Sequence, residues 1–369
     1  MRSAGALAIS AGYGMIPPLV IYFTNAGMSN QAISILIAIY PLFKSLGYLL
    51  GSVSIFKRQS SRSILFLASV TYFGMFYFSD SWSLFLFRAI EGLLLGLYVT
   101  KQSIEISKEN NATQNLAYLN SAASVGVFIG PLIVSAYLQS KHPLDSFLIP
   151  SLICFLIFIV FRGNSWTDSN SIKSKSFSSS LLSSENVSLL FTFFVFDFTY
   201  GFLSLTSSFT LTASFHENAS IATAYLLTIG FIIFSIFMPI FGKMINNRNS
   251  KPLLVISLFL IAICFYAIPY TINSKLLVYS SFIAEYILAS LAYCCVLSRM
   301  SNAHENIFSI GGAIQSGGMV AGPIAASILM SELSLEFTYM TLAALYALSC
   351  ALSAGLLSKA SSQTLPTFD

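Results

Sequence analysis

The sequence predicts an all-α polytopic membrane protein with twelve transmembrane helices in two pseudo-symmetric six-helix bundles. The first observation is composition: of 369 residues, 56% are hydrophobic and 9% are charged, whereas a typical soluble domain has about 25% charged residues. The second is that apolar stretches of about 20 residues, enough to span a bilayer, recur along the whole chain. The third is a repeat, because GVFIGPLIVS at residues 126–135 returns as GMVAGPIAAS at residues 318–327.

Polar breaks divide the chain into twelve predicted spans. Their residue ranges are 4–25, 31–56, 63–80, 82–105, 115–139, 146–162, 187–212, 219–242, 252–272, 276–298, 307–331 and 335–358. The first range is longer than the 7–15 apolar residues of a secretory signal and contains Pro17-Pro18, so we expect an uncleaved spanning helix.

The basic residues predict the orientation of these spans. If both termini lie on one side, fourteen of the 18 Lys and Arg residues lie on that side: Arg2, Lys57, Arg58, Arg62, Lys101, Lys108, Arg162, Lys173, Lys175, Lys243, Arg248, Lys251, Arg299 and Lys359. The positive-inside rule therefore places both termini in the cytoplasm. Lys101 and Glu105, four residues apart at the cytoplasmic end of the fourth span, are interpreted as a solvated surface pair.

A serine-rich stretch divides the chain into two halves. Residues 164–186 lack aliphatic periodicity and have the composition of a flexible tether. The predicted organisation is an N-terminal six-helix bundle at 1–163, a cytoplasmic linker at 164–186, a C-terminal six-helix bundle at 187–358 and a cytoplasmic tail at 359–369.

The repeated Gly-Pro stretches lie in the fifth and eleventh spans, 192 positions apart. Glycines four residues apart allow helices to approach closely, and a proline inside a helix bends it. We therefore expect a conformational hinge or seal in each half, formed by Gly126, Gly130 and Pro131 and by Gly318, Gly322 and Pro323. Duplicated six-helix units with sites near the midplane are a transporter architecture.

Five charged residues are the clear cases of charges well inside predicted spans: Lys44, Arg88, Glu91, Asp197 and Glu285. Charges in a bilayer are costly and usually face a bundle interior or an aqueous path, so each is a candidate for proton coupling or substrate binding. Arg88 and Glu91 are three apart on one helix and can pair; this pair is either structural or proton-coupling. Lys44 can pair with Asp197 or Glu285 in the other half, and the sequence does not decide between them.

Four further polar side chains are candidates for lining a cavity, because they lie beside charged, helix-breaking or glycine-rich positions. They are Tyr13, Tyr200, Tyr286 and Gln315.

Several classes of site are not predicted. The five cysteines all lie in apolar runs, and their spacing resembles neither a disulfide framework nor a zinc site. No GxxxxGK[ST] stretch is present, which argues against ATP-driven transport. We therefore expect no cofactor and no metal, with a proton gradient as the energy source.

Three motifs resemble those of the major facilitator superfamily. That family's loop after the second span reads Gly, three residues, Asp-Arg, one residue and Gly, followed by basic residues. Here the copies are GSVSIFKRQSSR and GKMINNRNSK, with Ile55 and Asn246 at the acidic position. The matching residues are Gly51 and Arg58 in the first copy and Gly242 and Arg248 in the second.

RAIEG at residues 88–92 is similar to the family's fourth-span Arg, two residues, Gln-Gly, with Glu91 in place of glutamine. GVFIGPLIVS resembles the fifth-span signature of the drug:proton antiporter branch, with Val134-Ser135 in place of its final glycine pair. The resemblance implies a twelve-span major-facilitator-type fold and a role of Arg88 in proton coupling.

The function we expect is proton-coupled secondary transport by alternating access, exporting a small organic compound such as a drug-like molecule, siderophore or metabolite. An importing symporter of a metabolite is the alternative, and an integral-membrane enzyme is a minor one, because the three histidines are scattered. The expected partners are the substrate and the lipid bilayer of the plasma (inner) membrane. We expect a monomer and no nucleic-acid partner. Substrate, direction and a choice between H⁺ and Na⁺ are not fixed by the sequence.

Overall fold

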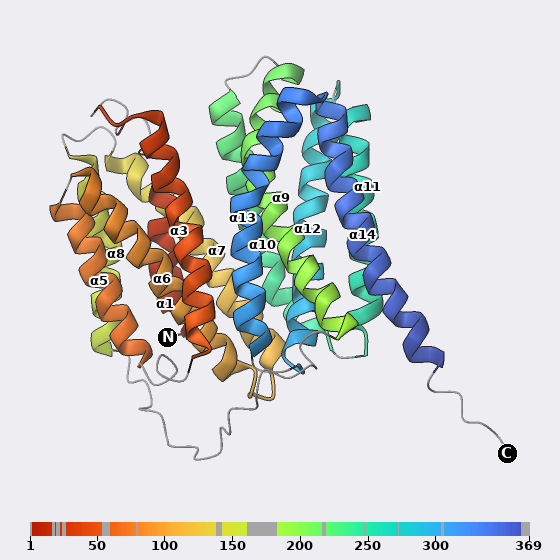
Figure 1. Ribbon diagram of the computed structural model, residues 1–369, viewed down its shortest axis with the longest axis horizontal. Coiled ribbons are helices and arrows are strands. Elements are labelled where there is room, and N and C mark those ends of the chain that lie inside the picture. The colour runs from red at the N-terminus through yellow and green to blue at the C-terminus, as the bar shows by residue number, and fades with distance from the viewer. Residues whose placement is uncertain are drawn as a thin grey trace. The chain divides into compact units, whose positions relative to one another are not determined.

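We describe the protein from a computed structural model. It places residues 2–16, 19, 23, 27–53, 60–78, 80–137, 142–160, 183–215, 219–246, 248–271, 273–303 and 306–362. Within these ranges every long regular element is a helix, as Figure 1 shows. The predicted all-α class is therefore confirmed for the described residues.

The elements follow one another without a strand in the described ranges. They are α1 (Arg2–Met15), α3 (Asn30–Gly51), α5 (Ser61–Tyr77), α6 (Ser81–Ile106), α7 (Ala112–Tyr137), the 3-10 helix η2 (Pro143–Phe147), α8 (Leu148–Val160), α9 (Ser184–Phe215), α10 (Ala219–Met244), α11 (Ser250–Thr271), α12 (Lys275–Met300), α13 (Asn306–Glu332) and α14 (Leu335–Ser362).

Each predicted span overlaps one of the long helices, but some ends differ. The first span was expected to extend to residue 25; α1 ends at Met15, and most residues from 17 to 26 lie outside the described ranges. The sequence explains this end, because a proline at 17 lacks the N–H that would continue the hydrogen-bond ladder. At the other extreme, α9 begins at Ser184, inside the range predicted as linker, and α14 continues to Ser362, inside the predicted tail.

Eight of the described helices are long and apolar enough to cross a membrane, with shorter apolar stretches at 35–51 and 228–244. They support a multi-pass integral membrane protein. The number of twelve spans stays a prediction.

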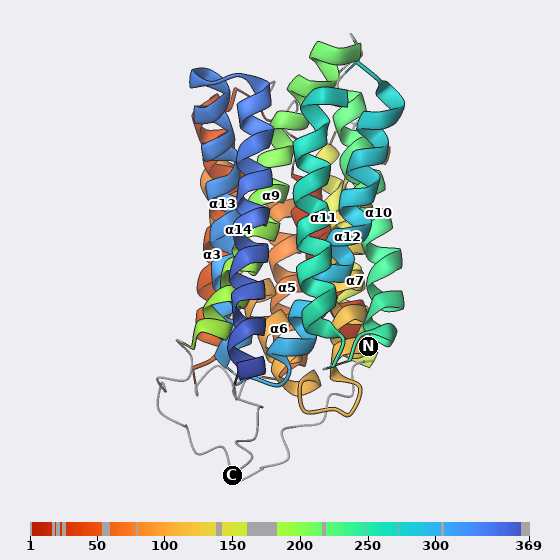
Figure 2. The same ribbon diagram turned by 90° about the vertical axis from the view of Figure 1, so that its right-hand side faces the viewer.

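The chain divides into two compact units. Unit 1 comprises Met1–Asn110, Asn115–Ser176 and Phe308–Gly317, and unit 2 comprises Asn111–Gln114, Phe177–Ile307 and Gly318–Asp369. Residues 164–182 of the predicted linker lie outside the described residues. In unit 1, α3 packs along α6, and α5 packs against α6 and α8; in unit 2, α11 packs against both α12 and α14 (Figure 2).

Glycines allow α3 and α6 to approach with their backbones in contact. A Cβ added to Gly92 would meet the carbonyl oxygen of Tyr40, and one added to Gly96 would meet that of Lys44. A backbone carbonyl cannot rotate away as a side chain can, so larger residues at these positions would force the helices apart. This close packing places Arg88 and Glu91 of α6 deep within unit 1.

The fifth-span glycines pack against the first helix of unit 1. A Cβ on Gly126 or Gly130 would meet a backbone carbonyl of α1, and a Cβ on Gly14 would lie 2.9 Å from Cδ of Pro131. The glycine positions therefore hold α7 directly on α1.

Unit 2 repeats this arrangement between α13 and α9. A Cβ on Gly318 or Gly322 would meet a backbone carbonyl of α9, and one on Gly201 would lie 2.8 Å from Cδ of Pro323. The Gly-Pro helix thus packs on the first helix of its own unit in both copies. Whether either proline acts as a hinge stays a prediction.

Candidate functional site

Arg88 and Glu91 form a buried ion pair on α6. Each side chain is 1% exposed, and Nη1 of Arg88 donates to Oε2 of Glu91. The predicted i,i+3 pairing is therefore present. Burial of two opposite charges is tolerated where each finds a partner, and here the partners are one helical turn apart.

Arg88 also bonds to the end of α1. Its Nη1 lies 3.3 Å from the Gly12 carbonyl oxygen and its Nη2 lies 3.3 Å from that of Tyr13. The last four carbonyls of a helix have no donor within it, and the residue four places after Tyr13 is a proline. Arg88 therefore supplies the Tyr13 carbonyl with a hydrogen bond that Pro17, lacking an N–H, cannot, and its positive charge suits a helix C-terminus.

Two stacked tyrosine rings lie beside the guanidinium. Its Cζ lies 4.3 Å from the centroid of Tyr40 and 5.4 Å from that of Tyr13, and the two rings stack with centroids 4.5 Å apart. A cation over an aromatic face is attracted by the ring quadrupole, more strongly when water is excluded. Tyr13, predicted to line a cavity, is thus a contact of Arg88 in this structure.

Glu91 receives a second donor at its other oxygen. The Tyr72 hydroxyl lies 3.1 Å from Oε1 of Glu91 and 2.5 Å from the Ile9 carbonyl oxygen of α1, so its single hydrogen is shared between these two acceptors. Gly12 leaves the space for this carboxylate, since an added Cβ would lie 2.5 Å from Oε1. Oε2 of Glu91 is therefore held by Arg88 and Oε1 lies beside the Tyr72 hydroxyl, in a network that links α6, α5 and α1.

Glu285 is in a different environment on α12 in unit 2. Its side chain is 4% exposed, and Oε2 has no hydrogen-bond partner among the described residues. No described lysine, arginine or histidine pairs with it. A buried carboxylate without a donor or a cation is costly, so the neutral acid is the form that this environment favours.

The groups that interact electrostatically with Glu285 come from three helices. They are Cys264 of α11, Tyr286 of α12 and Tyr346 of α14. Tyr346 packs among aromatic rings, with its centroid 5.6 Å from that of Phe265. None of these groups carries a positive charge, so they do not neutralise an ionised Glu285.

The other predicted site residues lie apart from this cluster or at its edge. Asp197 on α9 is half-buried and interacts electrostatically with Tyr346. Lys44 on α3 is half-buried, with Nζ 5.7 Å from the Tyr48 ring centroid. Its pairing with Asp197 or Glu285 stays a prediction.

The remaining cavity candidates are half-buried. The Tyr200 ring lies 5.1 Å from that of Phe231, Tyr286 packs where Gly230 lacks a side chain, and Gln315 lies on α13. A cavity lined by these residues stays a prediction.

The loop motifs are only partly visible. Gly51 packs against Thr100 of α6, while Arg58 lies outside the described residues. In the second copy Gly242 is buried and Arg248 is exposed. Asn246, at the position of the missing aspartate, accepts backbone N–H groups of the turn at its side-chain oxygen, which fixes that turn without a charge.

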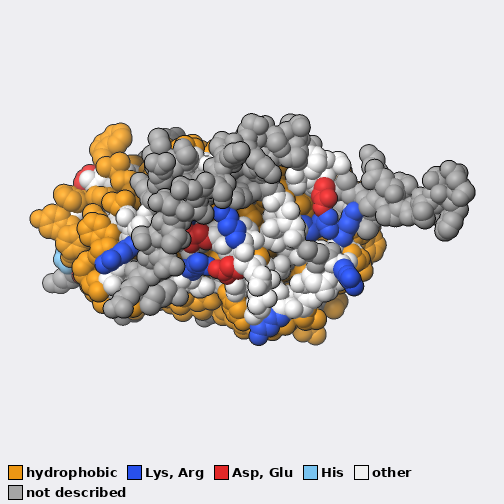
Figure 3. Space-filling view, turned by 90° about the horizontal axis from the view of Figure 1, so that it is seen from below, with side chains coloured by type: hydrophobic (Ala, Val, Ile, Leu, Met, Phe, Trp, Pro, Cys, Tyr) orange, Lys and Arg blue, Asp and Glu red, His pale blue; other side chains and the backbone are white. Residues whose placement is uncertain are grey.

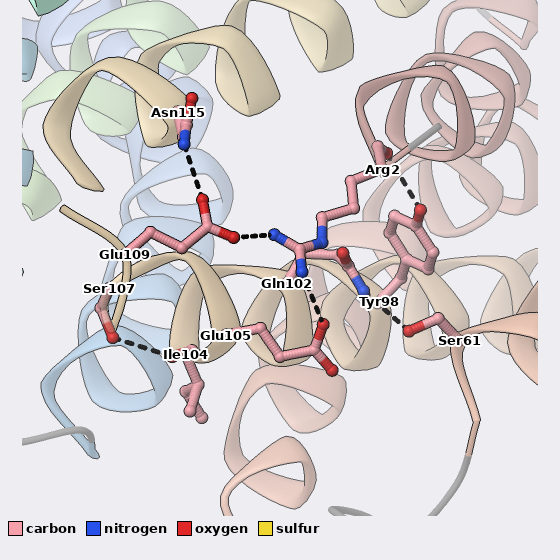
Figure 4. Close-up of polar contacts among 9 residues, drawn as sticks. All are labelled: Arg2, Ser61, Tyr98, Gln102, Ile104, Glu105, Ser107, Glu109 and Asn115. Carbon is pink, nitrogen blue, oxygen red and sulfur yellow. Dashed lines mark hydrogen bonds and ion pairs between the residues drawn. The ribbon is translucent and has the colours of Figure 1, made fainter. Parts of the chain in front are cut away.

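Sequence reasoning missed a charged clasp at the N-terminal end of α1, shown in Figure 4. Arg2 bonds to Glu109 and lies 3.6 Å from Glu105, while Glu109 also accepts from Asn115 Nδ2 at 2.6 Å. The clasp joins α1, α6 and α7. Lys101 interacts electrostatically with Glu105 as predicted, but the predicted solvation of this pair was wrong, because Lys101 is 8% exposed. The Glu105 carboxylate also lies 3.6 Å from Arg2.

Unit 2 has a corresponding clasp with the charges reversed. Glu185 at the start of α9 accepts from Arg299 near the end of α12. In each unit the first helix is thus tied to the fourth by an ion pair. Figure 3 shows Lys, Arg, Asp and Glu side chains on one face of the molecule. The pairs are separated by more than 100 residues in the sequence, so helical spacing gives no signal for them.

Within the described ranges, no group of three or more His, Cys, Asp or Glu side chains is arranged to hold a metal ion.

Comparison with known proteins identifies the family. The model of the Major Facilitator Superfamily matches residues 3–306, which is more than half of the chain. The chain belongs to the Major Facilitator Superfamily. No curated protein matches the chain.

The solved structures agree on the fold. The human organic anion transporter MFSD10 (TETRAN) superimposes with a TM-score of 0.75, covering 95% of this chain and 97% of that one at 16% identity. At this identity the likeness shows the fold alone. A major facilitator fold indicates a membrane transporter of small molecules rather than an enzyme.

Proposed function

We propose that this major facilitator protein is a proton-coupled exporter of a small organic compound that works by alternating access. The observation that carries the proposal is the presence of two carboxyl groups, Glu91 and Glu285, that are 1% and 4% exposed on apolar helices of different units. Ionisable groups are rare at such depth and mark ion or substrate paths. A titratable carboxyl that is reached from each side in turn is what proton coupling requires.

The direction of transport is proposed from the fifth-span motif. GVFIGPLIVS resembles the signature of the antiporter branch, and its Gly126, Gly130 and Pro131 pack on α1, the helix that Arg88 holds by its end. We propose that this packed region and its copy at Gly318, Gly322 and Pro323 accommodate the change between outward- and inward-open states.

The remaining site assignments are part of the same proposal. Asp197 and Lys44 contribute to coupling or substrate binding, Arg88 holds the end of α1, and Tyr200, Tyr286 and Gln315 line the substrate path. The protein is a plasma (inner) membrane monomer with both termini in the cytoplasm, energised by the proton gradient without a bound cofactor.

Transport in inverted membrane vesicles tests the function. Vesicles containing the full chain are given an acidic interior and screened with radiolabelled organic cations, organic anions and neutral amphipathic compounds. An exporting antiporter accumulates its substrate inside, and a protonophore abolishes the accumulation. Accumulation only when the exterior is acidic would instead favour the importing symporter. If no compound responds to either gradient, proton-coupled transport is refuted.

A further inference from the structure

We infer that Glu285 of α12 is the proton-binding carboxyl of this protein, and that the Arg88–Glu91 pair of α6 is a fixed ion pair that anchors the end of α1. The inference rests on the proposed proton-coupled transport and deepens it, because it chooses between the two buried acids. The choice follows from the hydrogen-bond partners of the two carboxyl groups.

Glu91 is held as a carboxylate by its surroundings. Oε2 accepts from Arg88 and Oε1 lies 3.1 Å from the Tyr72 hydroxyl. A proton added to Glu91 would remove the compensating charge of an arginine that is 1% exposed. Breaking a buried pair in this way leaves one uncompensated charge, which is strongly unfavourable. Glu91 therefore keeps its charge while α1 keeps its anchor.

Glu285 has the opposite arrangement. It is 4% exposed, and its Oε2 has no donor within the described residues. Hydrogen bonds from donors would stabilise the ionised form, and none is supplied at this oxygen. A proton on Oε2 removes the buried charge with no loss of an existing bond. A protonated Glu285 is thus suited to the closed interior of unit 2, and an ionised one requires access to water or a cation.

The titratable groups around Glu285 support this assignment, since none is cationic. Cys264 faces it from α11, Tyr286 from α12 and Tyr346 from α14. From α9, Tyr200 and Asp197 interact with Tyr286 and Tyr346 respectively. The side chains described on α10 between 228 and 242 include no titratable group.

The chemical consequence is a carboxyl that exchanges one proton with whichever side is open. The O–H bond at Glu285 forms with a proton from the more acidic side and breaks when water from the other side reaches it. The negative charge of the ionised state then opposes closure of unit 2 over it, because a charge without a partner is costly in an apolar environment. Proton binding and closure of the α11, α12 and α14 packing are therefore coupled.

Infrared difference spectroscopy on the full chain in liposomes tests the inference. Spectra recorded across a pH titration report the C=O stretching band of a protonated carboxyl. We expect a band that appears as the pH falls, is absent from Glu285→Gln and titrates at a shifted pH in Glu285→Asp. Glutamine has nearly the same shape as the neutral acid, so Glu285→Gln is expected to fold, as a thermal unfolding midpoint near that of the wild type would show.

Glu91→Gln is the matched control, because it changes the other buried acid by the same single atom. The band is expected to persist in Glu91→Gln, while its thermal stability falls. A band that persists at full amplitude in Glu285→Gln, or the absence of any titrating band in the wild type, overturns the assignment. Replacing Na⁺ by K⁺ is expected to leave the titration unchanged, and a Na⁺-dependent band would overturn the proton as ligand.

The outcomes separate this inference from the proposed function. If the band is assigned to Glu285 but the vesicles show no proton-dependent transport, the proposed function is refuted, while Glu285 as a proton-binding site is supported. Proton-dependent transport with a titrating band that survives in Glu285→Gln would support the function and refute Glu285 as its proton site.

Discussion

Replacing Arg88 by methionine removes the anchor of α1 and leaves the Glu91 carboxylate buried without its partner. Both side chains are 1% exposed, so water cannot compensate. Removing one partner of a buried pair typically destabilises a protein by about 3–5 kcal/mol, and we expect Arg88→Met to fall in this range. Methionine keeps an unbranched apolar chain in the space beside the two stacked tyrosine rings, so loss of volume contributes little.

The double variant Arg88→Met/Glu91→Met separates the charge from the packing. With both charges gone, no buried ion is left alone, and such replacements are often near neutral. The carbonyls of Gly12 and Tyr13 still lose their donors, and interhelical hydrogen bonds in a bilayer average about 0.6 kcal/mol each. The expected loss for the double variant is therefore about 1 kcal/mol, well below that of Arg88→Met.

Unfolding of the purified protein in mixed micelles, titrated with a denaturing detergent, gives these free energies. Arg88→Lys serves as a control that keeps the charge but cannot reach both carbonyls as a planar fork does, and it should lie between the wild type and Arg88→Met. If the double variant is as unstable as Arg88→Met, the pair is not what makes the single change harmful. If Arg88→Met costs less than about 1 kcal/mol, far under the range for a broken buried pair, the anchor is not significant.

Three further changes test other parts of the fold. Reversing the charge of either Glu185 or Arg299 alone should lower the thermal midpoint slightly, since partly exposed pairs contribute about 0.2–1 kcal/mol. Reversing both charges together should restore the midpoint, and a midpoint that stays low in the double variant would count against the clasp. Gly322→Ala should cost about 1–3 kcal/mol through overpacking in the same unfolding assay, whereas Gly317→Ala, with open space around it, should be neutral; equal effects would disprove the backbone contact. Hydrogen bonds from Ser83 lower the pKa of Asp80 at the start of α6, so its carboxylate stabilises the protein above the unfolded pKa, and the difference in thermal midpoint between wild type and Asp80→Ala should shrink as pH falls through the lowered pKa; a difference independent of pH would refute the charged cap.

The positions of the helices were predictable because apolar length and breaks are local properties. The Arg88–Glu91 pair was also predictable, since residues three apart share a helical face. The predicted end of the first span at residue 25 stays a prediction, because most residues between 17 and 26 lie outside the described ranges.

Contacts between distant segments could not be read from spacing. The two hydrogen bonds from Arg88 to α1 join residues that are 75 and 76 positions apart in the sequence, and the clasp of Arg2 with Glu109 joins residues 107 positions apart. For Glu285 the sequence indicated a charge within a span, but the lack of a donor at its Oε2 depends on the packing of other helices around it. Partners, and their absence, are tertiary properties.

Coupling of protons to transport through Glu285 is the step on which the proposed mechanism depends. Proton movement on addition of a transported substrate, recorded with a pH-sensitive dye inside proteoliposomes, tests it most directly. Wild type is expected to move protons opposite to the substrate, and Glu285→Gln is expected to move none. A Glu285→Gln variant that still moves protons with its substrate as the wild type does would contradict the claim.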